Sequence, residues 1–382
     1  MKNETELRRI AKQFCIQGDI VNIEWINKGY INRTYKVETL SKHKHIHQYI
    51  LQRINTKVFP DAVALMSNFQ LVTEHLNKYL VMPGEHRRGM VQTLRPTRKG
   101  RLFYEDESGC WRLMTYFDDV YSMDIPHCGK VFYHAGVSFG RFIKAMSKVD
   151  PSEIYEVIPN FHNTASRYRD LETAIEKNPL GRVCEVESEI AFVRAHTDLY
   201  GKITEALERE EIPTRICHND TNLNNILFDN ETHLPVAIID LDTVMPSSPL
   251  YDFGDSMRIG TNTAKDDEKD LSKVSCNLSL YEEYARGYLE ACGDILTERE
   301  LSLLPYAAPI ITAEDGIRFL TDYINGDTYF HTDYQGQNLD RARTQLKLVA
   351  DMVEKLPRIR QILQKIYDEL GLSVSLVTNT EE

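Results

Sequence analysis

The sequence lacks the features that would place the protein in a membrane, in an oxidising compartment or on a nucleic acid. Among its 382 residues, no apolar run approaches the length of a membrane span, and the N-terminal segment has no hydrophobic signal core. The seven cysteines are scattered without a Cys-x-x-Cys pair, which favours a reducing cytoplasm over a disulfide framework. A formal net charge of −12 argues against nonspecific nucleic-acid binding. We therefore expect a cytoplasmic globular protein whose partners are neither membranes nor nucleic acids.

The order of apolar residues predicts an α+β fold. In the first third, alternating residues such as those at 21, 23 and 25 predict strands, and 61–80 has helical spacing. From about residue 128 onward helical patterns dominate. The further strands expected lie at 31–37, 47–54, 90–94, 101–105 and 111–117, and the long helices at 186–208 and 340–369. These patterns predict a small antiparallel sheet that carries one helix, followed by a mainly helical half.

The most informative segment begins at His218. Its order is His-x-Asp-x-x-x-x-Asn, an apolar strand, then Asp, which is the catalytic order of kinase-like phosphotransferases. Asp220 is expected to take the proton of the attacking hydroxyl, while His218 orients the loop. Asn225 and Asp240 are expected to hold Mg²⁺, which prefers oxygen ligands. If residues 226–228 and 236–239 pair as a hairpin, Asn225 and Asp240 become cross-strand neighbours.

A second motif, Asp252-Phe253-Gly254, has the letters of the metal-binding motif of protein kinases. Asp240, however, directly follows a strand and lies closer to Asn225 along the chain. We therefore assign metal binding to Asp240, with Asp242 in support. Asp252 and Asp255 are expected to brace the catalytic loop through hydrogen bonds.

These segments resemble a known family. The stretch from His218 to Asp242 resembles the catalytic loop and metal strand of the aminoglycoside phosphotransferase and choline kinase superfamily. HNDTNLNNILFD and DLDTVMPSSPLYDFGD are similar to segments of N-acetylhexosamine 1-kinases, as are NKGYINRTYKV, YILQRINTKVFPD and GIRFLTDYINGDTYF. The resemblance covers most of the chain. It implies a two-lobed, protein-kinase-like fold and the transfer of phosphate from ATP, with Mg²⁺, to the anomeric hydroxyl of GlcNAc or GalNAc.

The nucleotide lobe is expected to span residues 1–116, and the catalytic and acceptor lobe residues 117–382. Neither a glycine-rich GxGxxG loop nor a third-strand lysine is present in the first lobe. Gly29 in the turn 27–29 is expected to let backbone amides approach the phosphates. Arg53 is the candidate to replace the lysine, with an exposed strand arginine as the alternative. Further nucleotide contacts are expected from Asn32 and Thr34, and from Thr115 and Phe117 at the hinge.

Residues 316–330 are the candidate acceptor site. Arg318 and Asp322 share one helical face at i, i+4 spacing. Tyr323 and Asp327 follow around the turn at Asn325-Gly326. A guanidinium, carboxylates and an aromatic ring suit the hydroxyl groups of a sugar. A surface ion pair beside core tyrosines is the alternative.

Two other functions fit the motifs. The acceptor hydroxyl can belong to another small alcohol, such as an amino alcohol or an aminoglycoside. The missing lysine motivates a third hypothesis, a non-catalytic regulator that binds nucleotides. Retention of the whole His218 to Asp240 order argues against it.

Overall fold

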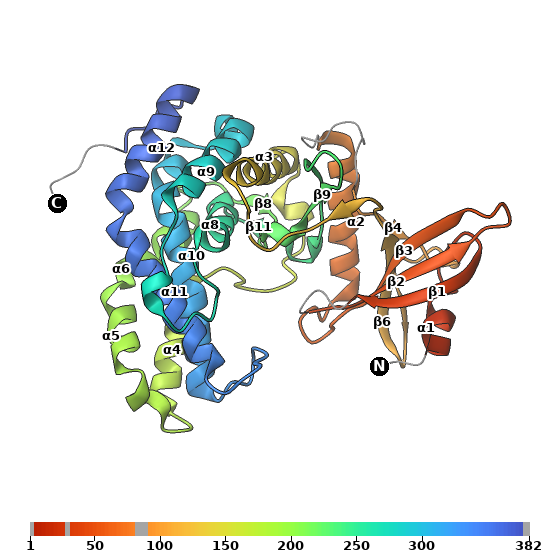
Figure 1. The fold of residues 1–382 in the computed structure, drawn as a ribbon, viewed down its shortest axis with the longest axis horizontal. Helices are drawn as coiled ribbons and strands as arrows, with labels where there is room; N and C mark the ends of the chain where they lie inside the picture. The colour runs from red at the N-terminus through yellow and green to blue at the C-terminus, as the bar shows by residue number, and fades with distance from the viewer. Residues whose placement is uncertain (1–3, 27–30, 81–90, 377–382) are drawn as a thin grey trace. The chain divides into compact units, whose positions relative to one another are not determined.

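The computed structural model describes residues 4–26, 31–80 and 91–376, which divide into two compact units (Figure 1). The first unit comprises Met1–Tyr121, Val149–Pro159 and Leu227–Met245. The second comprises Ser122–Lys148, Asn160–Ile226 and Pro246–Glu382. Asp220 and Asn225 thus belong to the second unit, and Asp240 to the first. Among the described residues, no helix has the length and apolar character that a bilayer crossing needs.

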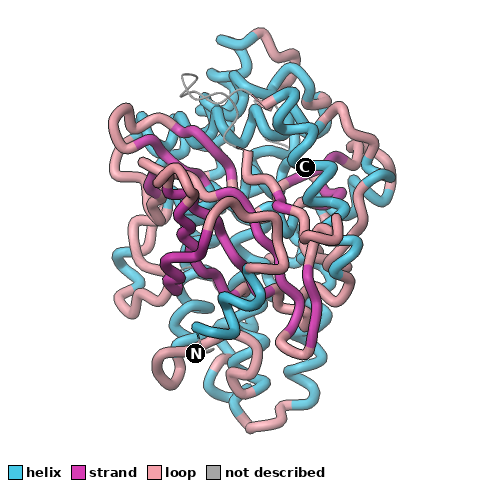
Figure 2. Tube along the Cα trace, turned by 90° about the vertical axis from the view of Figure 1, so that its right-hand side faces the viewer, coloured by secondary structure: helices cyan, strands magenta, loops and turns pink. Residues whose placement is uncertain are grey.

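An antiparallel sheet forms the body of the first unit (Figure 2). Its strands follow the order β1-β2-β3-β6-β4, and β5 pairs with β6. Their bounds are β1 Asp19–Ile26, β2 Arg33–Leu40, β3 Ile46–Arg53, β4 Leu94–Arg95, β5 Tyr104–Asp106 and β6 Gly109–Thr115. In the register of β2 with β3, Thr34 lies opposite Gln52. The antiparallel sheet predicted for the N-terminal region is therefore confirmed.

Two helices accompany this sheet. From α1 (Glu4–Ala11), Leu7 and Ile10 pack into a buried cluster with Val37, Leu51 and Trp111 of the strands. The longer helix, α2 (Ala62–Tyr79), begins after Asp61, whose side chain accepts hydrogen bonds from the next turn. An aspartate at this position satisfies N–H groups that have no partner within the helix. The helix predicted over 61–80 is confirmed.

The hairpin predicted after the catalytic motif is present. Strand β9 (Ile226–Asp229) pairs with β10 (Pro235–Ile238), and β7 (Val120–Tyr121) pairs with the other edge of β9. The side chain of Asp229 accepts N–H groups of the turn at 3.1 and 2.8 Å, which fixes the reversal of the chain. Asn225 directly precedes β9, and Asp240 follows β10 by two residues.

Helices make up most of the second unit, as predicted. Its centre is α10 (Glu298–Asn325), which packs against α4, α8 and α11 and opens with a capping box formed by Thr297 and Glu300. The other α-helices are α3 Gly129–Met146, α4 Thr164–Lys177, α5 Glu187–Ala195, α6 Thr197–Tyr200, α7 Lys202–Glu208, α8 Pro249–Thr261, α9 Leu278–Cys292, α11 Gln337–Glu354 and α12 Leu356–Leu370. The remaining short elements are strands β8 Arg215–Cys217 and β11 Met245–Ser247, and 3₁₀ helices η1 Pro151–Glu153, η2 Arg182–Glu185, η3 Leu223–Asn225, η4 Leu241–Thr243, η5 Leu271–Lys273 and η6 Gly293–Ile295.

Helices α3 and α9 approach so closely that two positions have no room for a side chain. A Cβ atom at Gly136 would lie 2.3 Å from the carbonyl oxygen of Tyr284, and one at Gly287 would lie 2.1 Å from that of Tyr133. Only glycine lets the two backbones meet at this distance. The contact fixes α3, whose Phe139 and Phe142 lie against the ring of His218.

Some predicted elements have other bounds. The helix expected at 186–208 consists of three helices, α5, α6 and α7. The one expected at 340–369 is divided into α11 and α12, because Pro357 lacks the N–H that a continuous helix needs. In place of the strand expected at 90–94, the described residues contain the two-residue strand Leu94–Arg95. The alternation in β1 predicts a strand correctly, yet Val21 and Trp25 are about half exposed, at 49% and 51%.

Candidate active site

The candidate catalytic loop, which begins at His218, follows β8 and is held by the first turn of α8. The backbone N–H groups of His218 and Asn219 donate to the two oxygens of the Asp252 carboxylate at 2.8 and 2.7 Å. Asn219 has a left-handed backbone with φ 63°, which asparagine tolerates better than most residues. The imidazole of His218 is fully buried. The prediction that Asp252 braces this loop is confirmed.

Asp255 provides the second brace, one helical turn further along α8. Its Oδ2 accepts the backbone N–H of Thr221 at 3.1 Å. The hydroxyl of Thr221 donates to the carbonyl oxygen of Asp252 at 2.6 Å. The hydroxyl of Ser256 donates to the carbonyl oxygen of Thr221 at 2.9 Å. The loop on both sides of Asp220 is therefore fixed by one buried helix end, and the predicted role of Asp255 is confirmed as well.

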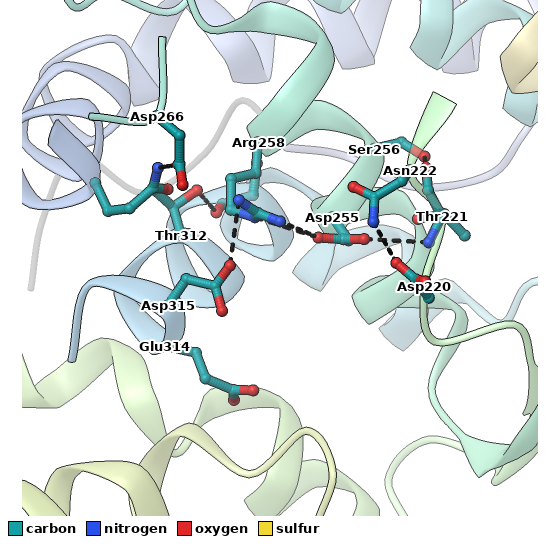
Figure 3. Close-up of polar contacts among 12 residues, drawn as sticks. Asp220, Thr221, Asn222, Asp255, Ser256, Arg258, Asp266, Thr312, Glu314 and Asp315 are labelled. Carbon is teal, nitrogen blue, oxygen red and sulfur yellow. Dashed lines mark hydrogen bonds and ion pairs between the residues drawn. The ribbon is translucent and has the colours of Figure 1, made fainter. Parts of the chain in front are cut away.

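The carboxylate of Asp220 lies between two asparagine side chains. Asn225 Nδ2 donates to Asp220 Oδ2 at 3.0 Å and to its carbonyl oxygen at 2.9 Å. Asn222 Nδ2 donates to Asp220 Oδ1 (Figure 3). These neutral amides orient the carboxylate without adding charge. Because Asn225 uses its amide nitrogen on Asp220, its amide oxygen is the atom that can face a cation.

His162 adds a charged contact that the sequence did not reveal. Its Nδ1 lies 3.1 Å from Glu314 Oε1, and its Nε2 lies 3.0 Å from the carbonyl oxygen of Asn219. Both neighbours accept hydrogen bonds, and a neutral imidazole has one N–H, so the two contacts require the imidazolium form. Burial lowers the pKa of His162, but the hydrogen bond to Glu314 and its charge outweigh this and raise the pKa above its ordinary value. The loop thus rests on an ion pair with α10.

The segment after β10, in the first unit, carries the predicted metal ligand. Asp240 has a left-handed backbone, with φ 59° and ψ 57°, and leads into η4. Burial and the charge of Asp242 raise the pKa of its carboxyl to about 6, although the charge of Arg112 acts to lower it. No hydrogen bond or ion pair with another described residue engages the Asp240 carboxylate. Its oxygens therefore remain available to a ligand.

Asp242 is used by the protein itself. Arg112 on β6 donates to Asp242 Oδ1 at 2.5 Å and to Oδ2 at 2.8 Å, and both side chains are buried. Asn32 Nδ2 donates to Asp242 Oδ2 at 2.7 Å. Gln52 accepts from the Arg112 guanidinium and donates to Thr34 Oγ1 at 3.0 Å. This connected network links three strands to the segment that carries Asp240.

Several residues predicted to bind the nucleotide therefore have internal partners. Asn32 and Thr34 belong to the network around Arg112, and Thr115 Oγ1 accepts the N–H of Thr93 at 3.0 Å. Arg53 makes no hydrogen bond or ion pair with another described residue, and Phe117 is partly exposed. Gly29 lies outside the described residues. The nucleotide contacts of these six positions stay predictions.

Arg112 is another residue that the sequence analysis did not identify. Since arginine is rarely buried, its place in the apolar strand Trp111-Arg112-Leu113 predicts a buried partner, and that signal was present.

Within the second unit, the predicted acceptor residues fall into two groups. Arg318 and Asp322 line a pocket of about 420 Å³ between α4, α10 and the segment that follows α10. Tyr323 and Asp327 bind η2 instead: Arg182 donates to Asp327 at 2.7 Å, and the Tyr323 hydroxyl donates to Glu185 at 2.7 Å. The structure therefore brings only the first pair to the pocket wall.

The carboxylate of Asp322 is saturated by the protein. It accepts the backbone N–H groups of Thr328, Tyr329 and Phe330, each at 2.9 Å, and Asn338 Nδ2 at 3.0 Å. Asp322 thus shapes the pocket wall that carries Tyr329 and Phe330. Arg318 donates to Asp315 at 2.9 Å and lies over the ring of Phe330.

The donor set suits magnesium. Among the described residues, no three side chains of His, Cys, Asp or Glu gather as a metal site. Mg²⁺ does not require such a cage, because it is commonly held by one or two side-chain oxygens together with substrate phosphates. The Asp240 carboxylate, in the first unit, and the Asn225 amide oxygen, in the second, are each an oxygen ligand of this kind.

Comparisons with known proteins bear on the family and the fold of the chain. The model of the family described as "Phosphotransferase enzyme family" matches residues 22–301. An aminoglycoside phosphotransferase from Alicyclobacillus acidocaldarius is similar with a TM-score of 0.56 and 13% identity, over 94% of this chain and 96% of that one. A spectinomycin phosphotransferase in complex with ADP and spectinomycin has a TM-score of 0.56 and 14% identity, over 89% and 94%. A choline/ethanolamine kinase family protein from Mesorhizobium loti has a TM-score of 0.54 and 16% identity, over 95% and 98%. These likenesses confirm the predicted α+β, protein-kinase-like fold.

Proposed function

The chain belongs to the phosphotransferase enzyme family, and we propose that it is an ATP- and Mg²⁺-dependent kinase acting on a sugar hydroxyl. The acceptor that we propose is the anomeric hydroxyl of an N-acetylhexosamine, which gives the sugar 1-phosphate. The observation that carries a catalytic function is the held Asp220 carboxylate. A protein that only bound nucleotides would not need to fix this carboxylate with two amides and the loop around it with two aspartates.

The charge of the pocket favours a neutral acceptor. The ionisable groups on its wall are the cations Arg167, Lys177 and Arg318 and the carboxylates Asp170 and Asp322. The Asp322 carboxylate already accepts four hydrogen bonds, so its roughly four acceptor positions are not left to an ammonium group of the acceptor. A polycationic aminoglycoside or a quaternary amine needs a more acidic wall than this one. Tyr329, which is 72% exposed, offers an aromatic face to a sugar ring.

The chemistry assigned to the chain is mostly positioning. Asp220 accepts the proton of the acceptor hydroxyl as its oxygen attacks the γ-phosphorus of ATP, and the bond from this phosphorus to the bridging oxygen of ADP breaks. Asn225 and Asp240 are the residues that would hold Mg²⁺, which neutralises charge on the phosphates when bound. We assign phosphate binding to Arg53, because a guanidinium can donate two parallel hydrogen bonds to phosphate oxygens.

Coupled ADP-release kinetics with a panel of acceptors test the proposal. The panel contains GlcNAc, GalNAc, glucose, choline, ethanolamine and an aminoglycoside. We expect saturable turnover with the N-acetylhexosamines and a product whose ³¹P signal couples to the anomeric proton. Loss of the reducing end separates the 1-phosphate from a phosphate on another hydroxyl.

The Asp220→Asn variant is the matched control. It should fold and bind ATP, and its turnover should fall by roughly 10²–10⁴-fold, the usual scale for loss of a general base. Turnover of choline or the aminoglycoside without turnover of any sugar would replace the proposed acceptor. ATP binding without turnover of any acceptor would instead support a regulatory protein.

A further inference from the structure

A largely buried arginine, Arg258, lies between the catalytic loop and the acceptor pocket. Arg258, near the end of α8, donates from Nη2 to Asp255 Oδ1 at 2.9 Å and from Nε to the same oxygen at 3.2 Å. Its Nη1 lies 3.2 Å from Asp315 Oδ2 on α10. Figure 3 shows the guanidinium between these two carboxylates, with Asp266 nearby. The side chain of Arg258 is only 12% exposed.

One end of this bridge reaches the backbone beside Asp220. Asp255 uses Oδ1 for Arg258 and Oδ2 for the backbone N–H of Thr221, the residue that follows Asp220. The two oxygens belong to one rigid carboxylate. A rotation of that carboxylate therefore changes both contacts at once.

The other end reaches the pocket. Asp315 uses Oδ2 for Arg258 and Oδ1 for Arg318 Nη1, at 2.9 Å. Arg318 lines the pocket, and its guanidinium lies 5.2 Å from the centre of the Phe330 ring. Four charged side chains thus alternate in sign from the pocket wall to the backbone beside the catalytic carboxylate.

We propose that Arg258 is a positioning residue that couples occupation of the acceptor pocket to the placement of Asp220. The inference rests on the proposed function, because it takes this pocket as the acceptor site. An acceptor that fixes the position of Arg318 also fixes Asp315, its ion-pair partner. Arg258 joins Asp315 to Asp255, and Asp255 holds the backbone of Thr221 next to Asp220. Lysine cannot replace it, because one ammonium group lacks the planar fork that serves two carboxylates.

The first experiment uses Arg258→Lys, with Arg343→Lys as the control. Arg343 also forms an ion pair in the second unit, with Glu189, and lies outside this chain of contacts. In Arg258→Lys we expect kcat for acceptor phosphorylation to fall by about 10–100-fold, while the KM for ATP changes by less than about twofold. ATP hydrolysed without phosphorylation of the acceptor should rise relative to product. Arg343→Lys should match the wild type in all three measurements.

A double-mutant cycle separates coupling from simple support of the fold. If Arg258 transmits the constraint, Arg318→Ala lowers kcat strongly in the wild-type background and about tenfold less in Arg258→Lys. Equal effects of Arg318→Ala in both backgrounds would overturn the proposal, as would an Arg258→Lys enzyme with a lower melting temperature and unchanged kcat. If Arg258→Lys does not fold, Asp315→Asn breaks the same link at its other end and takes its place. A wild-type enzyme that phosphorylates no acceptor would count against the proposed function itself.

Discussion

Arg112 on β6 and Asp242 in η4 form an ion pair inside the first unit, with the two side chains only 1% and 3% exposed. Two hydrogen bonds join them, and the ring of Phe69 lies 5.0 Å from the guanidinium. The pair fastens the segment of Asp240 to the antiparallel sheet. Arg112 thus places a buried positive charge beside the segment that carries Asp240. The third strand, β3, contains no lysine.

Removing one member of this pair should be far more damaging than removing both. Arg112→Met leaves the Asp242 carboxylate buried without its counter-charge, and we expect a loss of about 3–5 kcal/mol in the free energy of unfolding. Arg112→Met combined with Asp242→Leu should recover much of that loss. Urea denaturation measures both. Arg9→Met, which breaks an exposed ion pair with Asp106, should change stability little; an equal cost for Arg9→Met and Arg112→Met would disprove the expectation.

Asp240 and Asp252 should respond differently to truncation. Asp240→Ala removes a carboxylate that has no partner in the described chain, so the protein should keep its melting temperature and lose magnesium-dependent turnover. Asp252→Ala leaves two buried N–H groups without an acceptor, at about 1–3 kcal/mol each, and should mainly lower stability. Magnesium titration of activity and thermal melting of both variants decide the matter. The reverse pattern would move the metal site to Asp252.

The stabilising contact of His162 should weaken as the pH rises. Its pKa is raised in the folded protein, so the stabilisation is complete below the unfolded value of about 6.5 and is lost as the pH rises through the folded value. The groups that act on it are Glu314, Asp255 and the carbonyl oxygen of Asn219. The difference in melting temperature between wild type and His162→Gln should therefore shrink between pH 6 and 9. A constant difference would show that the imidazole does not titrate in this range.

Asp322→Ala should weaken acceptor binding by loosening the pocket wall. Three backbone N–H groups of the segment after α10 lose their acceptor, so Tyr329 and Phe330 are no longer held. We expect the KM for the sugar to rise by about 10–100-fold and the KM for ATP to stay nearly constant. Asp327→Ala, which loses a salt bridge outside the pocket wall, is the comparison. Steady-state kinetics with each substrate varied in turn gives the answer, and an effect confined to ATP would contradict the assignment.

Local patterns predicted the fold well where one pattern dominates a segment. The strands of the sheet, the helix starting after Asp61 and the β9–β10 hairpin each follow from alternation, capping or turn chemistry. The helices expected at 186–208 and 340–369 were too long, because the breaks depend on single residues such as Pro357. The order of residues also gives no sign that Val149–Pro159 and Leu227–Met245 pack with the N-terminal unit.

The candidate site was predictable in its motif and unpredictable in its contacts. The bracing roles of Asp252 and Asp255 followed from their position after the catalytic segment. His162 and Arg112 lie far along the chain from the groups they bind, as does Arg258 from Asp315, so no spacing rule links these pairs. Asp322 shows the opposite difficulty, since a carboxylate in an aromatic, glycine-containing segment suggests a ligand contact, whereas its hydrogen bonds are all internal.

The stretch from Glu314 to Tyr323 of α10 bears on how such an enzyme can acquire a new acceptor. Within this stretch, Glu314 supports His162, Asp315 faces Arg258, and Arg318 and Asp322 line the pocket. If this pocket is the proposed acceptor site, selection for a different acceptor would act on the same few helical turns that support the candidate catalytic loop. Substitutions that let the enzyme use a new acceptor should therefore at first lower kcat. Restoring kcat should then need further substitutions on α8.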